Sequence, residues 1–158
     1  MKLEIPHLKK MPFASIDLHF AAAVGNMAGK DFAEQPALFA AASIASAAVR
    51  NGHACCDLRV FEQKPFSFFF QEISGGSSAY DPDLDDPSVP SVDSFRKVIR
   101  PPWGIVLNPG DPEEGNENYP LILDPCGRLY LSRYYYYEKE LADLLSCGGC
   151  IAALPPIP

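Results

Sequence analysis

The longest nearly unbroken apolar stretch of the chain, residues 36–49, predicts a buried helix. Ser43 and Ser46 are its only polar residues, so the helix has no side suited to solvent. Pro36 fits the first turn of a helix, where the N–H that proline lacks would have no partner, and Gly52 fits the left-handed residue that ends one. We therefore expect this helix to form the core, with the other elements packed around it.

The chain before this helix predicts one further helix. Residues 1–12 form a polar lead-in with two prolines, and we assign them no regular structure. Ser15 is suited to cap the start of the next helix, and Asp17 places a negative charge in its first turn, where the helix dipole favours it. Residues 25–35 then suit a polar connection. The apolar stripe expected to face the core consists of Ile16, Phe20 and Val24.

The middle of the chain mixes strand, helix and loop signals. Residues 53–61 predict a strand, and Pro65 follows as a break. Residues 66–73 contain four phenylalanines and suit either a short helix or a strand. Residues 74–90 have the glycine, serine and aspartate content of a flexible acidic loop. Residues 91–99 predict a helix of two turns.

The last third predicts a hairpin followed by a helix. Residues 103–107 suit a strand, and residues 108–119 form an acidic loop. Two short apolar runs, residues 121–123 and 129–131, flank the tight turn D-P-C-G-R, which is the clearest hairpin pattern in the sequence. Residues 133–145 have the spacing of a helix that leads away from the hairpin.

The predicted C-terminal helix contains four consecutive tyrosines. Its spacing predicts a core-facing side that consists of Tyr134, Tyr137, Leu141 and Leu144. Tyr136 shares the other side with Glu140 and Asp143, so we expect it to be exposed. An exposed tyrosine can anchor a protein partner, stack on a nucleic-acid base, or be an ordinary, partly covered surface residue. The neighbouring acids weigh against the nucleic-acid role.

These elements predict a mainly helical α+β fold with a β-hairpin or a small antiparallel sheet near its C-terminal end. A chain of 158 residues with 47% hydrophobic residues is sufficient for one core, so we expect a single globular domain over residues 13–146. The lead-in, residues 1–12, precedes this domain. Residues 147–158 are expected to be a tail or a linker.

The charge balance argues against nucleic-acid binding by this chain alone. It contains 13 Lys and Arg against 20 Asp and Glu, a net charge of −7, with no Lys or Arg from residue 65 to residue 95. Because Lys and Arg neutralise phosphates when a protein binds DNA, this composition disfavours a DNA-binding surface.

The composition also indicates the cellular compartment of the protein. No apolar run reaches the roughly 18 to 20 residues that cross a membrane, and the N-terminus lacks the apolar segment of a signal peptide. The five cysteines are an odd number without a disulfide framework, which favours reduced thiols. We therefore expect a cytoplasmic protein without a membrane partner.

Histidine and cysteine residues are the main candidates for chemistry. His53 could act as an acid, a base or a ligand with Cys55 or Cys56, but a histidine just after a helix end also satisfies backbone carbonyls there, and we prefer that structural role. Cys147 and Cys150 are spaced as half of a zinc site or as a redox pair. A small cysteine-dependent metal-binding or redox protein is therefore the alternative function.

Known catalytic motifs are absent from the sequence. It contains no G-x-x-x-x-G-K-[ST] phosphate loop, no G-x-S-x-G elbow and no H-E-x-x-H pair. We accordingly predict no catalytic, cofactor-binding or metal-binding residue.

Three blocks of the sequence can be compared, by their order and spacing, with known protein families. Residues 16–21 form the first, residues 46–58 the second, and residues 120–134 the third. The structural signature of the second block consists of Ser46, Gly52, His53, Cys55 and Leu58. In order and spacing the three blocks resemble the N-terminal domain of the alpha subunit of exodeoxyribonuclease V, the RecD family.

The resemblance implies a helical domain with a small β-element that precedes the motor domains of an ATP-dependent helicase subunit. Such a subunit moves along single-stranded DNA within a RecBCD-type nuclease of recombination and repair. The N-terminal domain of the family docks against the gamma subunit, and through it to the beta subunit, and is not itself catalytic. ATP, magnesium and DNA are accordingly expected to bind only a motor region beyond Pro158.

Overall fold

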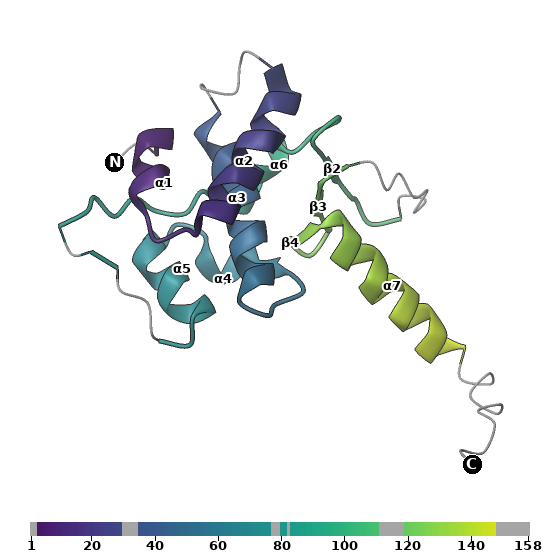
Figure 1. Cartoon of the computed structure of the whole chain (residues 1–158). Helices are drawn as coiled ribbons and strands as arrows, with labels where there is room; N and C mark the ends of the chain where they lie inside the picture. The colour runs from purple at the N-terminus through teal and green to yellow at the C-terminus, as the bar shows by residue number, and fades with distance from the viewer. Residues whose placement is uncertain (1–2, 30–34, 77–79, 82, 111–118, 148–158) are drawn as a thin grey trace.

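The computed structural model describes residues 3–29, 35–76, 80–81, 83–110 and 119–147. Within these ranges the chain is mainly helical with one small sheet, which confirms the predicted α+β class. Figure 1 shows α1 to α6 gathered together, the sheet beside them, and α7 running outward from the sheet. The helices are α1 (Ile5–Lys10), α2 (Ser15–Ala28), α3 (Pro36–Arg50), α4 (Leu58–Phe61), α5 (Phe66–Ile73), α6 (Val92–Val98) and α7 (Ser132–Ser146). The strands are β1 (Cys56–Asp57), β2 (Gly104–Val106), β3 (Leu121–Leu123) and β4 (Arg128–Leu131).

The central helix α3 confirms the prediction of a buried helix. It contacts α1, α2, α6, β1 and β4, and every residue from position 38 to position 48 except Ser46 is buried. Its end is a Schellman motif: the N–H of His53 donates to the carbonyl of Ala48 at 3.0 Å, and the N–H of Gly52 donates to the carbonyl of Val49 at 2.9 Å. Gly52 has a φ of 88°, so glycine is required at this position.

Helix α2 begins at the predicted residue but is capped and oriented differently. Ala14 occupies the N-cap, and its N–H donates to the carboxylate of Asp17 at 3.0 Å, so Ser15 is not the cap. Of the predicted apolar stripe, Val24 is buried and Phe20 is partly buried, but Ile16 is 63% exposed, so its assignment to the core-facing side is wrong. The buried side instead consists of Asp17, Ala21, Val24 and Gly25. These mostly small residues allow α2 to pack closely on α3, and the helix continues to Ala28 into the predicted connection.

The lead-in, for which no regular structure is predicted, contains the helix α1. Pro6 lies in the first turn of α1, and Leu8 is fully buried. Met11 and Phe13 follow α1 and are also buried. The helix has six residues, too few for a recognisable apolar period, and its place in the fold depends on these three core contacts.

The predicted strand at residues 53–61 is formed only in part, and its second half is a helix. Only β1, at Cys56–Asp57, is extended, and α4 begins directly after it. The cause is local, because the carboxylate of Asp57 accepts a hydrogen bond from the N–H of Arg59 at 3.1 Å and caps the new helix. Residues 66–73, whose sequence suits either a short helix or a strand, form the helix α5. Its buried side has helical spacing: Phe66, Phe69, Phe70 and Ile73.

The predicted acidic loop at residues 74–90 is fastened to the domain over its second half. Val89 is buried, and its carbonyl and N–H pair with Gln63 and Lys64, each at 2.8 Å. The carboxylate of Asp86 accepts from the N–H of Ser67 at 3.0 Å, at the start of α5. This half of the loop is therefore part of the packed domain and not a flexible connection.

The predicted hairpin is β3 and β4, and it belongs to a four-stranded sheet with the order β1-β4-β3-β2. The sheet is mixed, because β2 pairs in parallel with β3 whereas the other two pairs are antiparallel. In the hairpin turn, the carboxylate of Asp124 accepts from the N–H of Arg128 at 2.8 Å and from its Nε at 2.7 Å. Gly127 in the same turn has a φ of 80°.

Helix α7 confirms the predicted C-terminal helix in place and length. It contacts the sheet strands β3 and β4, and Figure 1 shows its second half extending away from the rest of the domain. Neither α7 nor any other helix within the described ranges is long and apolar enough to cross a membrane.

Candidate docking surface

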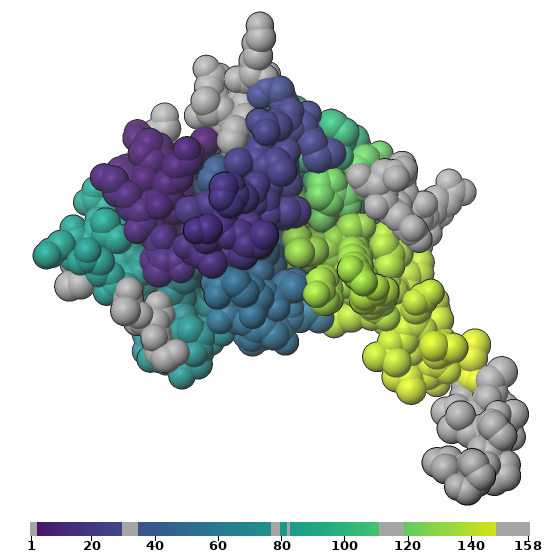
Figure 2. Space-filling view, in the orientation of Figure 1, coloured from purple at the N-terminus to yellow at the C-terminus, as the bar shows by residue number. Residues whose placement is uncertain are grey.

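A groove of about 660 Å³ lies where α7 leaves the domain. It is lined by side chains of α2, of α7 and of the segment before β3. Figure 2 shows α2 and α7 side by side on this face of the molecule. The lining residues that present rings or long side chains are Phe20, Met27, Tyr119, Arg133, Tyr136 and Tyr137. Aromatic and arginine side chains of this kind dominate protein interfaces, so we call this feature the aromatic groove.

The first two turns of α7 form a ladder of aromatic contacts. The Tyr135 ring packs edge-on against Tyr130 of the sheet with centroids 5.3 Å apart, and against Tyr136 at 5.5 Å. The Nε of Arg133 donates to the hydroxyl of Tyr137 at 2.6 Å, and its guanidinium lies 5.3 Å from that ring centroid. The hydrogen bond raises the pKa of Arg133, which stays charged. These contacts hold the groove wall in one conformation.

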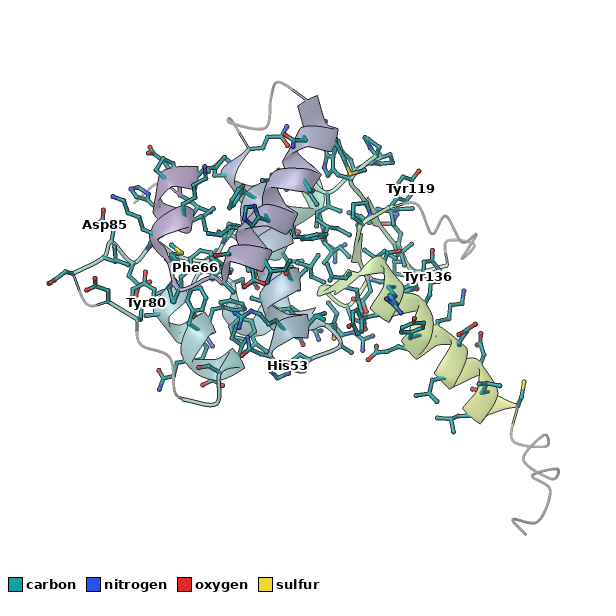
Figure 3. All side chains as sticks on the ribbon, viewed as in Figure 1. His53, Phe66, Tyr80, Asp85, Tyr119 and Tyr136 are labelled. Carbon is teal, nitrogen blue, oxygen red and sulfur yellow. The ribbon has the colours of Figure 1, made fainter. Side chains whose placement is uncertain are left out.

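Tyr136 is half-buried and not exposed as predicted. The side of α7 that meets the domain has the spacing i, i+3, i+4 and i+7: Ser132, Tyr135, Tyr136 and Lys139. This side is offset from the predicted one, because α7 is held only at its base and the sheet fixes its rotation there. Figure 3 shows Tyr136 near Tyr119 at the base of α7, where both line the groove.

The predicted core face of α7 is largely uncovered. Tyr137 is 50% exposed, Leu141 57%, Leu144 69% and Leu145 65%. The expectation that Tyr137, Leu141 and Leu144 join the core is therefore wrong. Because these residues share one side of a helix, they form a continuous apolar stripe that extends the aromatic groove toward the end of α7. We call Leu141, Leu144 and Leu145 the leucine stripe.

The signature residues around the end of α3 form a structural joint. The carboxylate of Asp17 is fully buried and accepts from the hydroxyl of Ser46 at 2.7 Å and from the Nε of Arg50 at 3.2 Å. Leu58 is fully buried, and its N–H donates to the carbonyl of Gly127 in the hairpin turn at 3.0 Å. These two contacts tie the second block to the first and third blocks.

His53 lies at an exposed position beside the joint. Its ring Nε2 lies 3.4 Å from the carbonyl of Ile73 at the end of α5, and its N–H completes the end of α3. Figure 3 shows His53 well apart from Tyr119 and Tyr136. The contacts agree with the structural role that we prefer for this histidine.

The cysteines beside His53 are poorly suited to nucleophilic chemistry. Cys56 is 3% exposed, and burial raises the pKa of its thiol strongly. Burial also raises the pKa of Cys55, partly offset by a hydrogen bond with Tyr130. Both thiols therefore stay protonated near neutral pH, whereas thiolates are the reactive and metal-binding form.

Metal ligands do not gather in the part of the chain that the structure describes. No three His, Cys, Asp or Glu side chains there are placed to hold a metal ion. Cys147 is exposed at the end of α7. Cys150, the other half of the predicted cysteine pair, lies outside the described residues.

Residues 9–130 match the sequence profile of a family described as RecBCD enzyme subunit RecD, N-terminal domain. The match covers well over half of the 158 residues. The chain belongs to the RecD N-terminal domain family. This confirms the resemblance suggested by the three sequence blocks. The RecD profile ends at Tyr130, so α7 and the leucine stripe lie just beyond it. Searches of curated proteins and of solved structures found no match.

The sequence pattern predicts a contact role for Tyr136 but not the groove that Tyr136 lines. Phe20, Tyr119 and Tyr136 are far apart in the sequence, and only the packing of α2 against the base of α7 brings them together. Tyr137 was assigned to the core, although it is the more exposed of the two tyrosines. No local pattern predicts the groove, since it depends on the direction in which α7 leaves the sheet.

Proposed function

We propose that this RecD-family domain is a non-catalytic assembly domain, which docks an ATP-dependent helicase subunit to the gamma subunit of a RecBCD-type exodeoxyribonuclease V. Through the gamma subunit it would also be held to the beta subunit. The observation that carries the proposal is the aromatic groove with its exposed apolar extension on α7. Family membership supports the association with the recombination and repair nuclease.

The groove has the composition of an interface anchor. Tyr136 and Tyr137 present rigid rings with few rotatable bonds, and Arg133 is already oriented by its hydrogen bond, so little conformational entropy is lost on binding. The groove lining on α7 also includes Glu140, which is exposed. A complementary surface on the gamma subunit would therefore be apolar at its centre and basic at its edge.

The proposal assigns ATP, magnesium and DNA to a motor region and not to this domain. The sequence contains no phosphate loop, and its net charge of −7 disfavours contact with a phosphate backbone. We place the assembly in the cytoplasm, where the five cysteines would remain reduced.

Truncation of Tyr136 tests this surface. We expect Tyr136→Ala to weaken binding to the gamma subunit by about tenfold or more, because it removes an aromatic ring from the lining of the groove. The affinity is measured by titration calorimetry with the purified gamma subunit, and the melting temperature of the variant is recorded alongside it.

Tyr80→Ala is the matched control. Tyr80 is also a half-buried tyrosine, and Figure 3 shows it on the opposite side of the molecule from Tyr136. The control should keep the affinity of the parent chain. Equal affinities for Tyr136→Ala, Tyr80→Ala and the parent would remove the aromatic groove from the interface.

A further inference from the structure

A second pocket, of about 210 Å³, lies at the end of α3 and is lined by His53. It is enclosed by the turn after α3, by β1, by α4 and by α5. Figure 3 shows His53 well apart from Tyr136, so this pocket and the aromatic groove are separate features. Four lining side chains that are at most 9% exposed give it an apolar floor: Ala48, Cys56, Phe61 and Ile73. We call it the His53 pocket.

The charged side chains that line the His53 pocket are acidic. Asp57 and Glu72 contribute carboxylates, and none of the described residues in the lining is Lys or Arg. The Asp57 carboxylate is already occupied, because it accepts hydrogen bonds from the N–H, the Nε and the Nη2 of Arg59. These bonds lower the pKa of Asp57, which stays ionised.

The carboxylate of Glu72 is available to a partner. Glu72 is exposed, and within the part of the chain that the structure describes its carboxylate forms no ion pair or hydrogen bond. An exposed carboxylate at the edge of an apolar pocket attracts a positively charged group and repels an anion such as a phosphate.

The ring of His53 forms a fixed part of the pocket lining. Its Nε2 lies 3.4 Å from the carbonyl oxygen of Ile73, and the N–H of His53 donates to the carbonyl of Ala48 at 3.0 Å. Both the ring and the backbone are therefore held in place. A planar aromatic ring of this kind is a surface on which a guanidinium group can stack.

An apolar floor with a free carboxylate at its edge favours a long basic side chain as the ligand. A metal ion is disfavoured, because no three His, Cys, Asp or Glu side chains of the described residues are placed to hold one. Lys and Arg can lay their methylene stems on apolar surface while the charged head stays at the edge. Arg fits better than Lys, because its guanidinium is planar, weakly hydrated, and able to pair with both oxygens of a carboxylate.

We propose that the His53 pocket binds an arginine side chain of a protein partner. The stem of the arginine packs on the apolar floor, and its guanidinium pairs with Glu72 and stacks on the His53 ring. Arginine is one of the residues that contribute most to binding at protein interfaces. This inference goes beyond the proposed function, because it rests on a different surface and would stand if the aromatic groove bound nothing.

Titration of the full chain with Nα-acetyl-arginine amide tests the site. The probe is added at constant ionic strength, and the signals of Ala48, His53 and Ile73 are followed by NMR. We expect saturable shifts at these three residues with a dissociation constant in the millimolar range, since a single side chain buries little surface.

One further probe and two variants make the result specific. Nα-acetyl-citrulline amide has nearly the shape of the arginine probe without its charge, and it should bind at least about threefold more weakly. Glu72→Gln should weaken binding of the arginine probe by a similar factor. Glu4→Gln removes an exposed carboxylate from the start of α1 and should leave the affinity unchanged. Both positions are exposed, so neither variant should unfold the domain.

Either of two results would overturn the inference. The first is the absence of saturable shifts at the three residues up to about 50 mM of the arginine probe. The second is equal affinity of the parent chain for the arginine and citrulline probes, or equal affinity of the parent and Glu72→Gln for the arginine probe, since the ion pair would then play no part.

Discussion

His53 and Cys56 are residues that suggest chemistry in the sequence; in the fold, His53 is exposed beside the end of α3, and Cys56 is buried. The Nε2 of His53 lies 3.4 Å from a backbone carbonyl, and Cys56 is buried in the sheet opposite Leu129. Both lie next to a helix end where polar and small groups are needed. Their environment favours a neutral thiol and a structural histidine.

The buried thiol of Cys56 predicts a loss of stability at alkaline pH. Burial raises its pKa above the value of about 8.5 for an unfolded chain, so the folded state holds its proton longer. The contribution is complete below pH 8.5, and the free energy of unfolding should fall as the pH rises above it, by at most about 1.4 kcal/mol per pH unit. Urea unfolding between pH 8 and pH 10 measures this slope.

Replacement of the thiol provides the control for that slope. Cys56→Val should give a shallower pH dependence, whereas Cys126→Ser, which removes an exposed thiol, should keep the slope of the parent chain. Identical slopes for the parent and Cys56→Val would show that Cys56 does not titrate in this range.

At the scale of single residues, the sequence predicted special backbone positions better than it predicted which side of a helix is buried. The position of Gly52 at the end of α3 was predicted and is confirmed. The errors concern rotation: Ile16 points outward, and Tyr136 points toward the domain. Helical spacing fixes which residues share a side, but the neighbouring elements decide which side is buried.

Helices α2 and α3 are joined by a buried polar contact that no local sequence pattern predicts. Asp17 is fully buried in α2, and it accepts hydrogen bonds from Ser46 and Arg50 of α3. Ser46 and Arg50 are four residues apart and share one side of α3. The contact explains why a helix as apolar as α3 retains a serine at this position.

Removal of the Asp17 carboxylate should loosen this pair of helices. Asp17→Ala leaves the N–H of Ala14 and the hydroxyl of Ser46 without their acceptor, and we expect a loss of about 2–3 kcal/mol in the free energy of unfolding. Arg50 keeps 39% of its surface and can return to solvent, which limits the loss. Asp143→Ala, at an exposed position of α7, should change stability by less than about 0.5 kcal/mol. Equal stability of the two variants would contradict the proposed role of the contact.

At the scale of elements, the long and strongly patterned segments were predictable and the short ones were not. Helix α3, helix α7 and the hairpin have clear periods or turn sequences, and the structure confirms them. Helix α1 and strand β1 have six and two residues, so tertiary contacts determine them. The change from strand to helix at α4 depends on the cap by Asp57, a single-residue signal within an apolar run.

At the scale of the molecule, the domain separates a packed body from a projecting helix. The body contains residues 9–130, which match the RecD profile, and contacts among the three sequence blocks meet around the end of α3. Helix α7 follows the profile and presents the aromatic groove at its base and the leucine stripe near its end. This arrangement provides exposed contact surface at the base of α7 and along its outer part.

The alternative of a cysteine-dependent metal or redox protein finds little support in this arrangement. It depends on Cys150, which lies outside the described residues, and on a second pair of ligands. Cys55 and Cys56 are adjacent and protonated, so they are poorly suited to complete such a site.

The most direct test of the central claim is the binding of the purified domain to the gamma subunit of exodeoxyribonuclease V. An assembly domain should form a complex of one to one stoichiometry with a dissociation constant in the micromolar range or tighter, of the order of −8 kcal/mol or better. Titration calorimetry measures both quantities. A complex of this affinity that Tyr136→Ala weakens would support the assignment. No detectable binding at about 100 μM would contradict it. The binding free energy would then be weaker than expected by at least about 3 kcal/mol.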